Sequence, residues 1–289
     1  MNNGVLNIYK PKGLTSHDVV NKVRRIAGMK KVGHTGTLDP MAEGVLPICL
    51  GKATRIAEYL TADTKQYLAE MSFGQQTDTL DAEGEVTAEC ALPEADADQI
   101  LQILHSFTGK QKQIPPLYSA IKKDGKPLYK YARSGMDVII PEREITVFDI
   151  QLVQYNVKTL SFVVTCSKGT YIRSLARDIA IKAGSCGHLT YLQRTKSGHF
   201  DSKQSVTIDQ LALHGVQKFL ISIGKALPEF KKVVVSNEHL AKVTLGNAVF
   251  LPEQILSEEE LVAVESLAGE VVAIARLSDG HLQPKKVFV

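Results

Sequence analysis

Hydrophobic and polar residues alternate with two different periods along this chain, and these periods predict a mixture of helices and strands. Apolar residues at helical spacing predict helices over about residues 17–27, 53–60, 93–107 and 170–183. Apolar runs and two-residue alternation predict strands over about residues 4–8, 45–50, 66–74, 144–155, 159–166 and 189–194. The elements follow one another without a regular strand–helix–strand repeat, so the pattern indicates an α+β fold with a mixed or antiparallel sheet.

The pattern changes after about residue 230, where a short helix precedes predicted strands over about residues 248–251, 262–265, 271–276 and 286–288. A chain of 289 residues is long enough for about two domains. We therefore predict a first domain over residues 1–230 and a small β-rich domain over residues 231–289. The second domain lies near the lower size limit for independent folding.

Local signals mark the ends of the first helix and a long loop after it. Ser16 is a suitable N-cap for this helix, and Gly28 is a suitable residue to end it. The following segment, residues 29–44, contains glycines and a proline but little periodicity, which predicts a loop. Long loops inside compact domains are usually functional, so this segment is a candidate for the site.

The composition is that of a folded protein without a membrane anchor. Hydrophobic residues make up 44% of the chain and charged residues 22%, which excludes a disordered or low-complexity chain. No apolar stretch approaches the roughly 18 residues needed to cross a bilayer. The first residues, Met1 to Gly4, are followed by Tyr9 and Lys10 rather than by the apolar core of a signal peptide. We expect a cytoplasmic protein with no membrane partner.

The candidate metal ligands do not form a recognisable site. The four cysteines have no C-x-x-C spacing and stand at positions 49, 90, 166 and 186. We therefore expect reduced, mostly buried thiols, because Cys186 and His188 alone cannot complete a tetrahedral zinc site. The acidic segment 77–85 is similar to a calcium loop, but aligning Gly84 with the loop glycine places Thr79 first and Cys90 where the bidentate glutamate belongs. No metal is expected.

The net charge of +3 is small, but the charges are unevenly distributed. Residues 1–55 carry nine basic and three acidic residues, and residues 106–200 carry fifteen and six. Residues 56–105 carry one basic and eleven acidic residues, and residues 201–289 carry nine and eleven. Two basic blocks separated by an acidic one are typical of a protein that binds a polyanion, although an ordinary solvated surface would give the same counts.

A single carboxylate stands out in the long loop. Pro40 disfavours the helical region for Asp39, and the neighbouring glycines allow close approach of the backbone, so the loop can present Asp39 to a bulky ligand. The loop sequence, GHTGTLDPMAEGVLPICLG over residues 33–51, resembles the catalytic motif of the TruB family of tRNA pseudouridine synthases. Four further segments resemble the same family in the same order: GVLNIYKPKGLTS, KQYLAEMSFGQQTDTLDAEG, PPLYSAIKKDGKPLYKYAR and CSKGTYIRSLARDIA.

The resemblance implies the pseudouridine synthase fold and a C-terminal PUA-like RNA-binding domain. It also implies isomerisation of the T-loop uridine that is conventionally numbered 55, by base flipping and without a cofactor. Asp39 matches the catalytic aspartate and Arg173 matches the arginine that pairs with it. A buried carboxylate needs such a cation to stay ionised. The sequence does not choose between attack of Asp39 on the sugar or base and removal of a ribose proton.

Other positions are matched to supporting roles. By resemblance, Tyr67 stacks on the flipped uracil, and Tyr171 and Leu192 line the same pocket. His34 matches a histidine that fills the space vacated by the base, and Lys10 matches a lysine near the pocket. For each of these residues, packing alone is the other interpretation. Asp81, in the acidic turn, is the remaining supporting residue, and we expect it to order the neighbouring strand of the active site.

Residues 106–135 combine basic and aromatic side chains, as an RNA-binding surface does. The basic residues are Lys110, Lys112, Lys122, Lys123, Lys126, Lys130 and Arg133. The segment resembles the family insertion that clamps the T arm of tRNA. We expect tRNA as the partner and a monomeric protein. The rival hypothesis is a tRNA-binding or folding module in which catalysis is absent or secondary.

Overall fold

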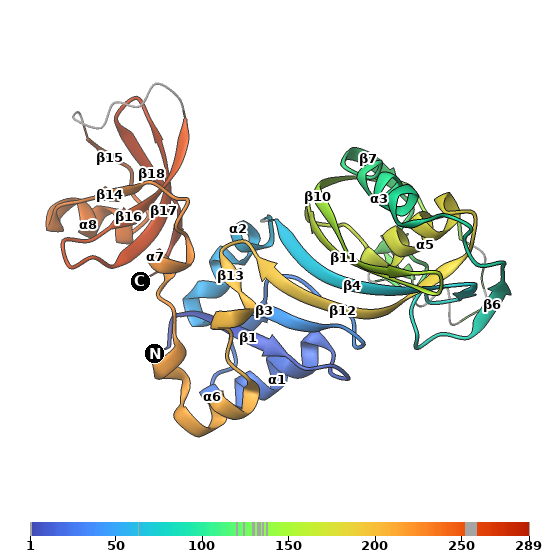
Figure 1. Cartoon of the computed structure of the whole chain (residues 1–289). Coiled ribbons are helices and arrows are strands. Elements are labelled where there is room, and N and C mark those ends of the chain that lie inside the picture. Colours follow the sequence, from blue (N-terminus) through green and yellow to red (C-terminus); the bar gives the residue numbers. More distant parts are fainter. Residues whose placement is uncertain are drawn as a thin grey trace.

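The structure is a computed structural model, and it describes residues 2–62, 64–119, 121–123, 125–128, 131, 134, 136, 138–251 and 259–288. The main element is a nine-stranded sheet (Figure 1). Its strands, in spatial order, are β1 (Gly4–Lys10), β3 (Glu43–Leu50), β12 (Gly187–Ser197), β4 (Lys65–Phe73), β11 (Thr159–Cys166), β10 (Arg143–Asn156) and β7 (Gly109–Gln113). The short strands β2 (Val32–His34) and β13 (Phe200–Asp201) pair with β3 and β12. Only β3 and β12 pair in parallel within this sheet, so the predicted mixed sheet is confirmed.

Burial along the strands follows their position in the sheet. β4 and β11 alternate between buried and partly exposed residues, as expected for strands with one face on the core. β3 is buried along almost its whole length, because the core clusters on the two sides of the sheet take alternate residues of this strand. The close pairing of β3 with β12 depends on Gly44, where a Cβ would lie 2.3 Å from the carbonyl oxygen of Arg194.

The helices complete the core of the first sheet (Figure 1). The helix α1 (Ser16–Ala27) contacts β2 and α6 (Ile208–His214), and α5 (Ile172–Lys182) contacts β12. The helix α3 (Ala97–His105) contacts β10 and α5. Each predicted helix of this region exists, but α3 begins after the cap residue Asp96 rather than at Pro93. The predicted helix over 53–60 is a 3₁₀ turn, Gly51–Ile56, followed by α2 (Ala57–Ala62).

The cap of α1 differs from the prediction by one residue. Thr15, not Ser16, accepts the hydrogen bond from the Asp18 N–H, and the Asp18 carboxylate accepts from the Thr15 N–H in return. Ser16 is buried, and its hydroxyl bonds both the N–H and the carbonyl of Leu38 at 2.8 and 3.0 Å. The sequence contains two adjacent cap-forming residues, and only the contact with Leu38 determines which of them caps the helix. The helix ends at Gly28 as predicted, with φ of 62°.

The C-terminal part of the chain forms a second sheet with its own core. Its strands, in spatial order, are β14 (Lys232–Val234), β16 (Glu260–Glu265), β17 (Val271–Ser278), β18 (His281–Val287) and β15 (Val249–Phe250), with α8 (Asn237–Thr244) packed beside them. A β-rich C-terminal domain is therefore present, as expected. A further core cluster joins it to the first sheet through side chains such as Val5, Ile56, Ile274 and Phe288. The boundary after residue 230 stays a prediction.

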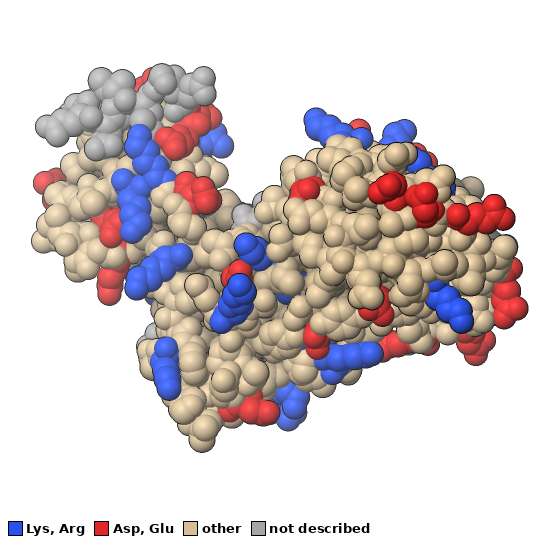
Figure 2. Space-filling view, viewed as in Figure 1, with Lys and Arg blue, Asp and Glu red and all other residues tan. Residues whose placement is uncertain are grey.

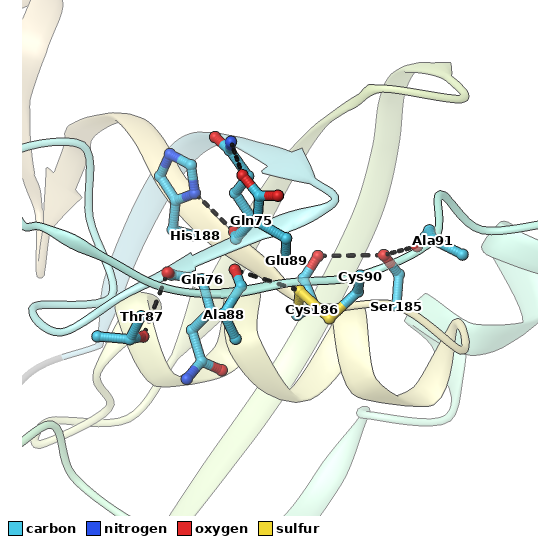
Figure 3. The surroundings of a disulfide bond; sticks show 10 residues. All are labelled: Gln75, Gln76, Thr87, Ala88, Glu89, Cys90, Ala91, Ser185, Cys186 and His188. Carbon is cyan, nitrogen blue, oxygen red and sulfur yellow. Dashed lines mark hydrogen bonds between the residues drawn. A yellow bond between two sulfur atoms is a disulfide. The ribbon is translucent and has the colours of Figure 1, made fainter.

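The expectation that all four cysteines are reduced is wrong. Cys90 and Cys186 form a disulfide across 96 residues of sequence (Figure 3). Cys49 and Cys166 are free and buried. The hairpin of β5 (Gln75–Thr77) and β6 (Val86–Glu89) lies beside the start of β12, which brings the two sulfurs together. The Ser185 hydroxyl supports this contact by donating to the carbonyl of Ala91 at 2.6 Å. Cysteine spacing cannot reveal a contact made by tertiary packing.

The surface reflects the uneven charge distribution of the sequence. Figure 2 shows acidic side chains gathered at the end of the molecule that carries β6. The exposed acids of this region are Asp78, Glu83, Glu85, Glu89, Glu94, Asp96 and Asp98. Within the residues that the structure describes, no helix is both long and apolar enough to cross a membrane.

Candidate active site

A cavity of about 500 Å³ opens between the loop before β3 and the sheet. Its wall combines the loop residues 35–40, the strand β4 at Lys65 and Tyr67, and the strand β12 at Leu192 and Arg194. The turn 167–173, which leads into α5, also lines the cavity. The cavity therefore lies where four segments distant in sequence meet, and it contains five of the eight residues predicted for the site: Asp39, Tyr67, Tyr171, Arg173 and Leu192.

Asp39 is held at the cavity wall by the backbone around it. The bonds between Ser16 and Leu38 fix the residue before it, and the carbonyl of Asp39 accepts from the Ala42 N–H at 3.1 Å. The carbonyl of Pro40 accepts from the Gly13 N–H at 2.8 Å. The Asp39 side chain remains 34% exposed, so its carboxylate can meet a ligand that enters the cavity.

Arg173 approaches Asp39 from the first turn of α5. Its Nε lies 2.9 Å from Oδ2 of Asp39, close enough for an ion pair but without the alignment of a hydrogen bond. The same guanidinium donates to the carbonyl oxygens of Thr79 at 2.9 Å and Tyr118 at 3.0 Å. The Arg173 side chain is only 5% exposed, so its position is fixed by these contacts. The predicted pairing of Asp39 with Arg173 exists. The guanidinium contacts several acceptors and does not make a bidentate interaction with one carboxylate.

Asp81 lies behind this pair, away from the cavity wall. It is 5% exposed, and its Oδ2 is 3.4 Å from Nη1 of Arg173. Its Oδ1 accepts from the Thr79 hydroxyl at 2.6 Å and the Glu83 N–H at 3.1 Å, so the acidic turn is organised around this one carboxylate. Asp81 therefore orients Arg173 and the turn that follows β5. The acidic turn contacts the arginine through this carboxylate. Within the described residues, no cluster of three or more His, Cys, Asp or Glu side chains could hold a metal.

The aromatic wall is formed by Tyr67 and Tyr171. Tyr67 is 8% exposed, and burial raises the pKa of its phenol, so the ring is neutral at physiological pH. Tyr171 precedes α5, and both its N–H and its carbonyl bond the side chain of Gln113 at 2.9 and 3.1 Å. Burial likewise raises the pKa of Tyr171. Two neutral rings and Leu192 give this side of the cavity an apolar character that suits a flat, uncharged base.

Two predicted residues lie beside the cavity rather than in its wall. His34 is partly buried at the end of β2, and its Nδ1 accepts from the Gly36 N–H at 3.2 Å. Burial, helped by the charge of Arg194, lowers its pKa, so the ring is neutral and its Nδ1 can accept this bond. Lys10 is fully buried, and its ammonium donates to the carbonyls of Leu14 at 2.6 Å, Pro11 at 3.0 Å and Pro40 at 3.3 Å. Lys10 therefore holds the loop that carries Asp39.

Two protein-family models match this chain. The model of the N-terminal domain of TruB family pseudouridylate synthases matches residues 24–172, and that of the tRNA pseudouridylate synthase B C-terminal domain matches residues 173–218. The tRNA pseudouridine synthase B of Syntrophotalea carbinolica is 44% identical over 299 residues, which cover 99% of this chain and 98% of that protein. Its counterpart in Bacillus subtilis is 43% identical over 305 residues, with 100% and 98% covered. The chain belongs to the TruB family.

Solved structures show the same fold. A chain in the structure of an H/ACA RNP bound to a substrate RNA containing 2′-deoxyuridine has a TM-score of 0.76 and 26% identity, and the match covers 100% of this chain and 86% of that one. A chain of a Cbf5-Nop10-Gar1 complex has a TM-score of 0.75 and 28% identity, with 100% and 85% covered. The predicted pseudouridine synthase fold is confirmed for this TruB family member.

Arg194 is one of the buried cavity residues that sequence reasoning missed. Arg194 is 1% exposed and lines the cavity next to Tyr67, its partner in the β4–β12 register. It follows Leu192 by two residues, so both side chains lie on the same face of β12. That spacing was available as a signal, because it places an arginine on the apolar face of a predicted strand.

The predicted RNA clamp is described only in part. Lys110 and Lys112 lie exposed on β7, and Lys126 is exposed in the short strand β9 (Lys126–Pro127), which pairs with β8 (Lys122–Lys123). Tyr118 reaches the cavity wall through this segment. Lys130 and Arg133, which belong to the predicted clamp, lie outside the described residues.

Proposed function

We propose that this chain is a tRNA pseudouridine synthase that isomerises the T-loop uridine at position 55, with Asp39 as its catalytic residue. The observation that carries the proposal is the 2.9 Å ion pair between Asp39 and Arg173 at the wall of a cavity lined by Tyr67 and Tyr171. The identity of 43–44% to two proteins named tRNA pseudouridine synthase B supports the substrate and the reaction.

The chemistry explains why one carboxylate suffices. The reaction breaks the bond between N1 of uracil and C1′ of ribose, turns the base, and joins C5 to C1′. The base leaves with the electron pair of the broken bond and returns as the nucleophile, so no external nucleophile or redox partner takes part. Asp39 acts on the sugar or the base of the target nucleotide, and Arg173 orients its carboxylate through the ion pair. Asp81 supports this arrangement by orienting the guanidinium from behind.

The cavity also fits the step that precedes the chemistry. The target uridine is stacked in a folded loop and must be flipped out, at a cost of a few kcal/mol, before Asp39 can reach it. A cavity of about 500 Å³ is large enough for one nucleotide. In our proposal the uracil stacks on Tyr67, with Tyr171 and Leu192 on its flanks. His34 occupies the space that the base leaves, and Lys10 holds the loop.

RNA contacts outside the cavity follow from the charge and the domain arrangement. We assign the T arm to the basic segment 106–135, whose exposed lysines Lys110, Lys112 and Lys126 face solvent. We assign residues 1–230 to catalysis and residues 231–289 to a PUA-like domain that binds a more distant part of the same RNA. One chain contains every residue of the proposed site, so we propose a monomer that acts on tRNA in the cytoplasm.

The deciding experiment maps pseudouridine in an unmodified tRNA transcript after incubation with the full chain. Wild type should convert position 55, and Asp39→Asn should bind the tRNA but form no product. Asp178→Asn is the matched control, because Asp178 is also paired with an arginine and its side chain is 29% exposed, against 34% for Asp39. The control should retain activity. Binding without product in the wild type would favour the rival function, a tRNA-folding module.

A further inference from the structure

The cavity wall contains a second buried arginine besides Arg173. Arg194 is 1% exposed, and its guanidinium donates to three backbone carbonyls: Nε to Val45 at 2.7 Å, Nη2 to Gly36 at 3.1 Å and Nη1 to Thr37 at 3.4 Å. It also interacts with the neutral phenol of Tyr67. Within the described part of the chain, no carboxylate lies within ion-pair distance of Arg194. Its positive charge is therefore buried without a negative partner.

A buried charge without a counterion is costly, which makes its presence informative. Three carbonyls can be satisfied by neutral N–H donors, so holding the loop does not by itself require a cation. Arg173 differs in this respect, because two carboxylates, Asp39 and Asp81, already surround it. Among the arginines that line the described cavity, Arg194 is the one whose charge is not already paired.

The proposed reaction supplies a negative charge at this position. When the N1–C1′ bond breaks, the electron pair stays with N1, and the uracil becomes an anion whose charge is shared with its carbonyl oxygens. Arg194 lies opposite Tyr67 in the β4–β12 register, so a base stacked on that ring is adjacent to the guanidinium. Because Arg194 is buried, its fixed charge is poorly screened by water and stabilises an adjacent anion more than a cation in solution would.

We propose that the charge of Arg194 stabilises the detached uracil anion during pseudouridine formation. This inference rests on the proposed function, and it adds a second role to the residue that holds the loop. Once C5 has joined C1′ and lost its proton, N1 takes up a proton and the base is neutral again. Arg194 is thus expected to lower the barrier of bond cleavage and not to strengthen binding of the RNA.

The test compares two substrates, a T-arm stem-loop with uridine at the target position and the same RNA with 5-fluorouridine there. Fluorine withdraws electrons and stabilises the uracil anion without help from the protein. The readout is the single-turnover loss of the N-glycoside, because the fluorine blocks the final loss of a proton from C5. Arg194→Gln should slow the uridine reaction by about 10²- to 10³-fold, slow the 5-fluorouridine reaction clearly less, and leave the Kd for RNA unchanged. An equal loss on both substrates would overturn the proposal.

Two further variants keep the outcome decisive. Arg24→Gln removes another arginine that donates to a backbone carbonyl, that of Val32, but lies outside the cavity, and it should have normal rates on both substrates.

If Arg194→Gln does not fold, Arg194→Lys takes its place, because it keeps the charge with fewer donors. It should lose less than about tenfold and keep the wild-type ratio of the two rates. A loss of 100-fold or more shared by both substrates would show that only the hydrogen bonds matter. A wild type that forms no pseudouridine would instead refute the proposed function.

Discussion

The replacement of Arg173 by lysine tests how the charged centre of the cavity is built. The substitution keeps the positive charge but removes the planar fork of the guanidinium. In the wild type, that fork serves four acceptors: the carboxylates of Asp39 and Asp81 and the carbonyls of Thr79 and Tyr118. A lysine ammonium has three donors, so at least one buried acceptor loses its partner.

The size of the effect follows from these contacts. An unsatisfied buried acceptor costs about 1–3 kcal/mol, so the free energy of unfolding should fall by that amount. A well-aligned hydrogen bond to a charged group contributes about 1.5–3 kcal/mol, which is an upper bound for the unaligned contact with Asp39. If the lost contact is the one with Asp39, the isomerisation rate should fall by up to about 150-fold, since about 1.4 kcal/mol corresponds to a tenfold change. The loss should appear in the single-turnover rate and leave the affinity for tRNA almost unchanged.

The assay combines urea unfolding with single-turnover mapping of pseudouridine in a tRNA transcript. Arg177→Lys is the control, because Arg177 lies one turn further along α5 and also contacts a carboxylate and a backbone carbonyl, those of Asp178 and Ile114, but not the cavity. It should have near-normal activity. Normal turnover in Arg173→Lys together with reduced stability would show that Arg173 is structural only. Equal losses in both variants would show that the effect comes from the helix and not from the site.

Three other perturbations test separate features. Cys90→Ser should lower the free energy of unfolding by about 2–4 kcal/mol, because the disulfide closes a long loop. A reductant should lower the urea midpoint of the wild type but not that of the variant. A wild-type midpoint that does not shift would exclude the disulfide in solution. Burial lowers the pKa of Lys10 to about 8, below its value in the unfolded chain. The free energy of unfolding of the wild type should therefore rise relative to that of Lys10→Met between about pH 8 and 10.5, by up to about 3 kcal/mol in urea titrations. A difference that does not change with pH would contradict this. Replacing Lys110, Lys112 and Lys126 with glutamine should weaken tRNA binding. The slope of the logarithm of the binding constant against the logarithm of the salt concentration should become shallower by about one per lysine. An unchanged slope would show that the segment is ordinary solvated surface.

Periodicity predicted the elements of this fold because their burial is regular. β4 and β11 alternate as the sequence pattern requires, and Gly28 ends α1 in the left-handed conformation that glycine favours. Periodicity failed where one residue's tertiary contact decides the structure. The short strand β2 lies inside the predicted loop because residues 32–34 pair with β3, and nothing in three residues of sequence announces that partner.

The site was only partly accessible to sequence reasoning for a related reason. Asp39, Tyr67 and Arg173 stand in motifs that resemble the TruB family, so their positions could be predicted, and the structure brings all three to one cavity. The disulfide between Cys90 and Cys186 could not be predicted, because the β5–β6 hairpin meets β12 only after the sheet has formed. Arg194 stands outside the matched motifs, and only its place on the apolar face of a predicted strand marks it in the sequence.

The arrangement around Asp39 explains how a loop without regular structure can hold a reactive side chain. The carbonyls of Gly36, Thr37 and Pro40 lie in this loop, outside any strand or helix, and apart from the Gly13 N–H that bonds Pro40 they need donors from elsewhere in the fold. Only long side chains can reach them from the sheet, and Lys10 of β1 and Arg194 of β12 do so. The loop is therefore fixed to two neighbours of β3 by cations. The same two charges lower the cost of placing negative charge nearby, so the groups that give the loop its shape also prepare the cavity for an anion.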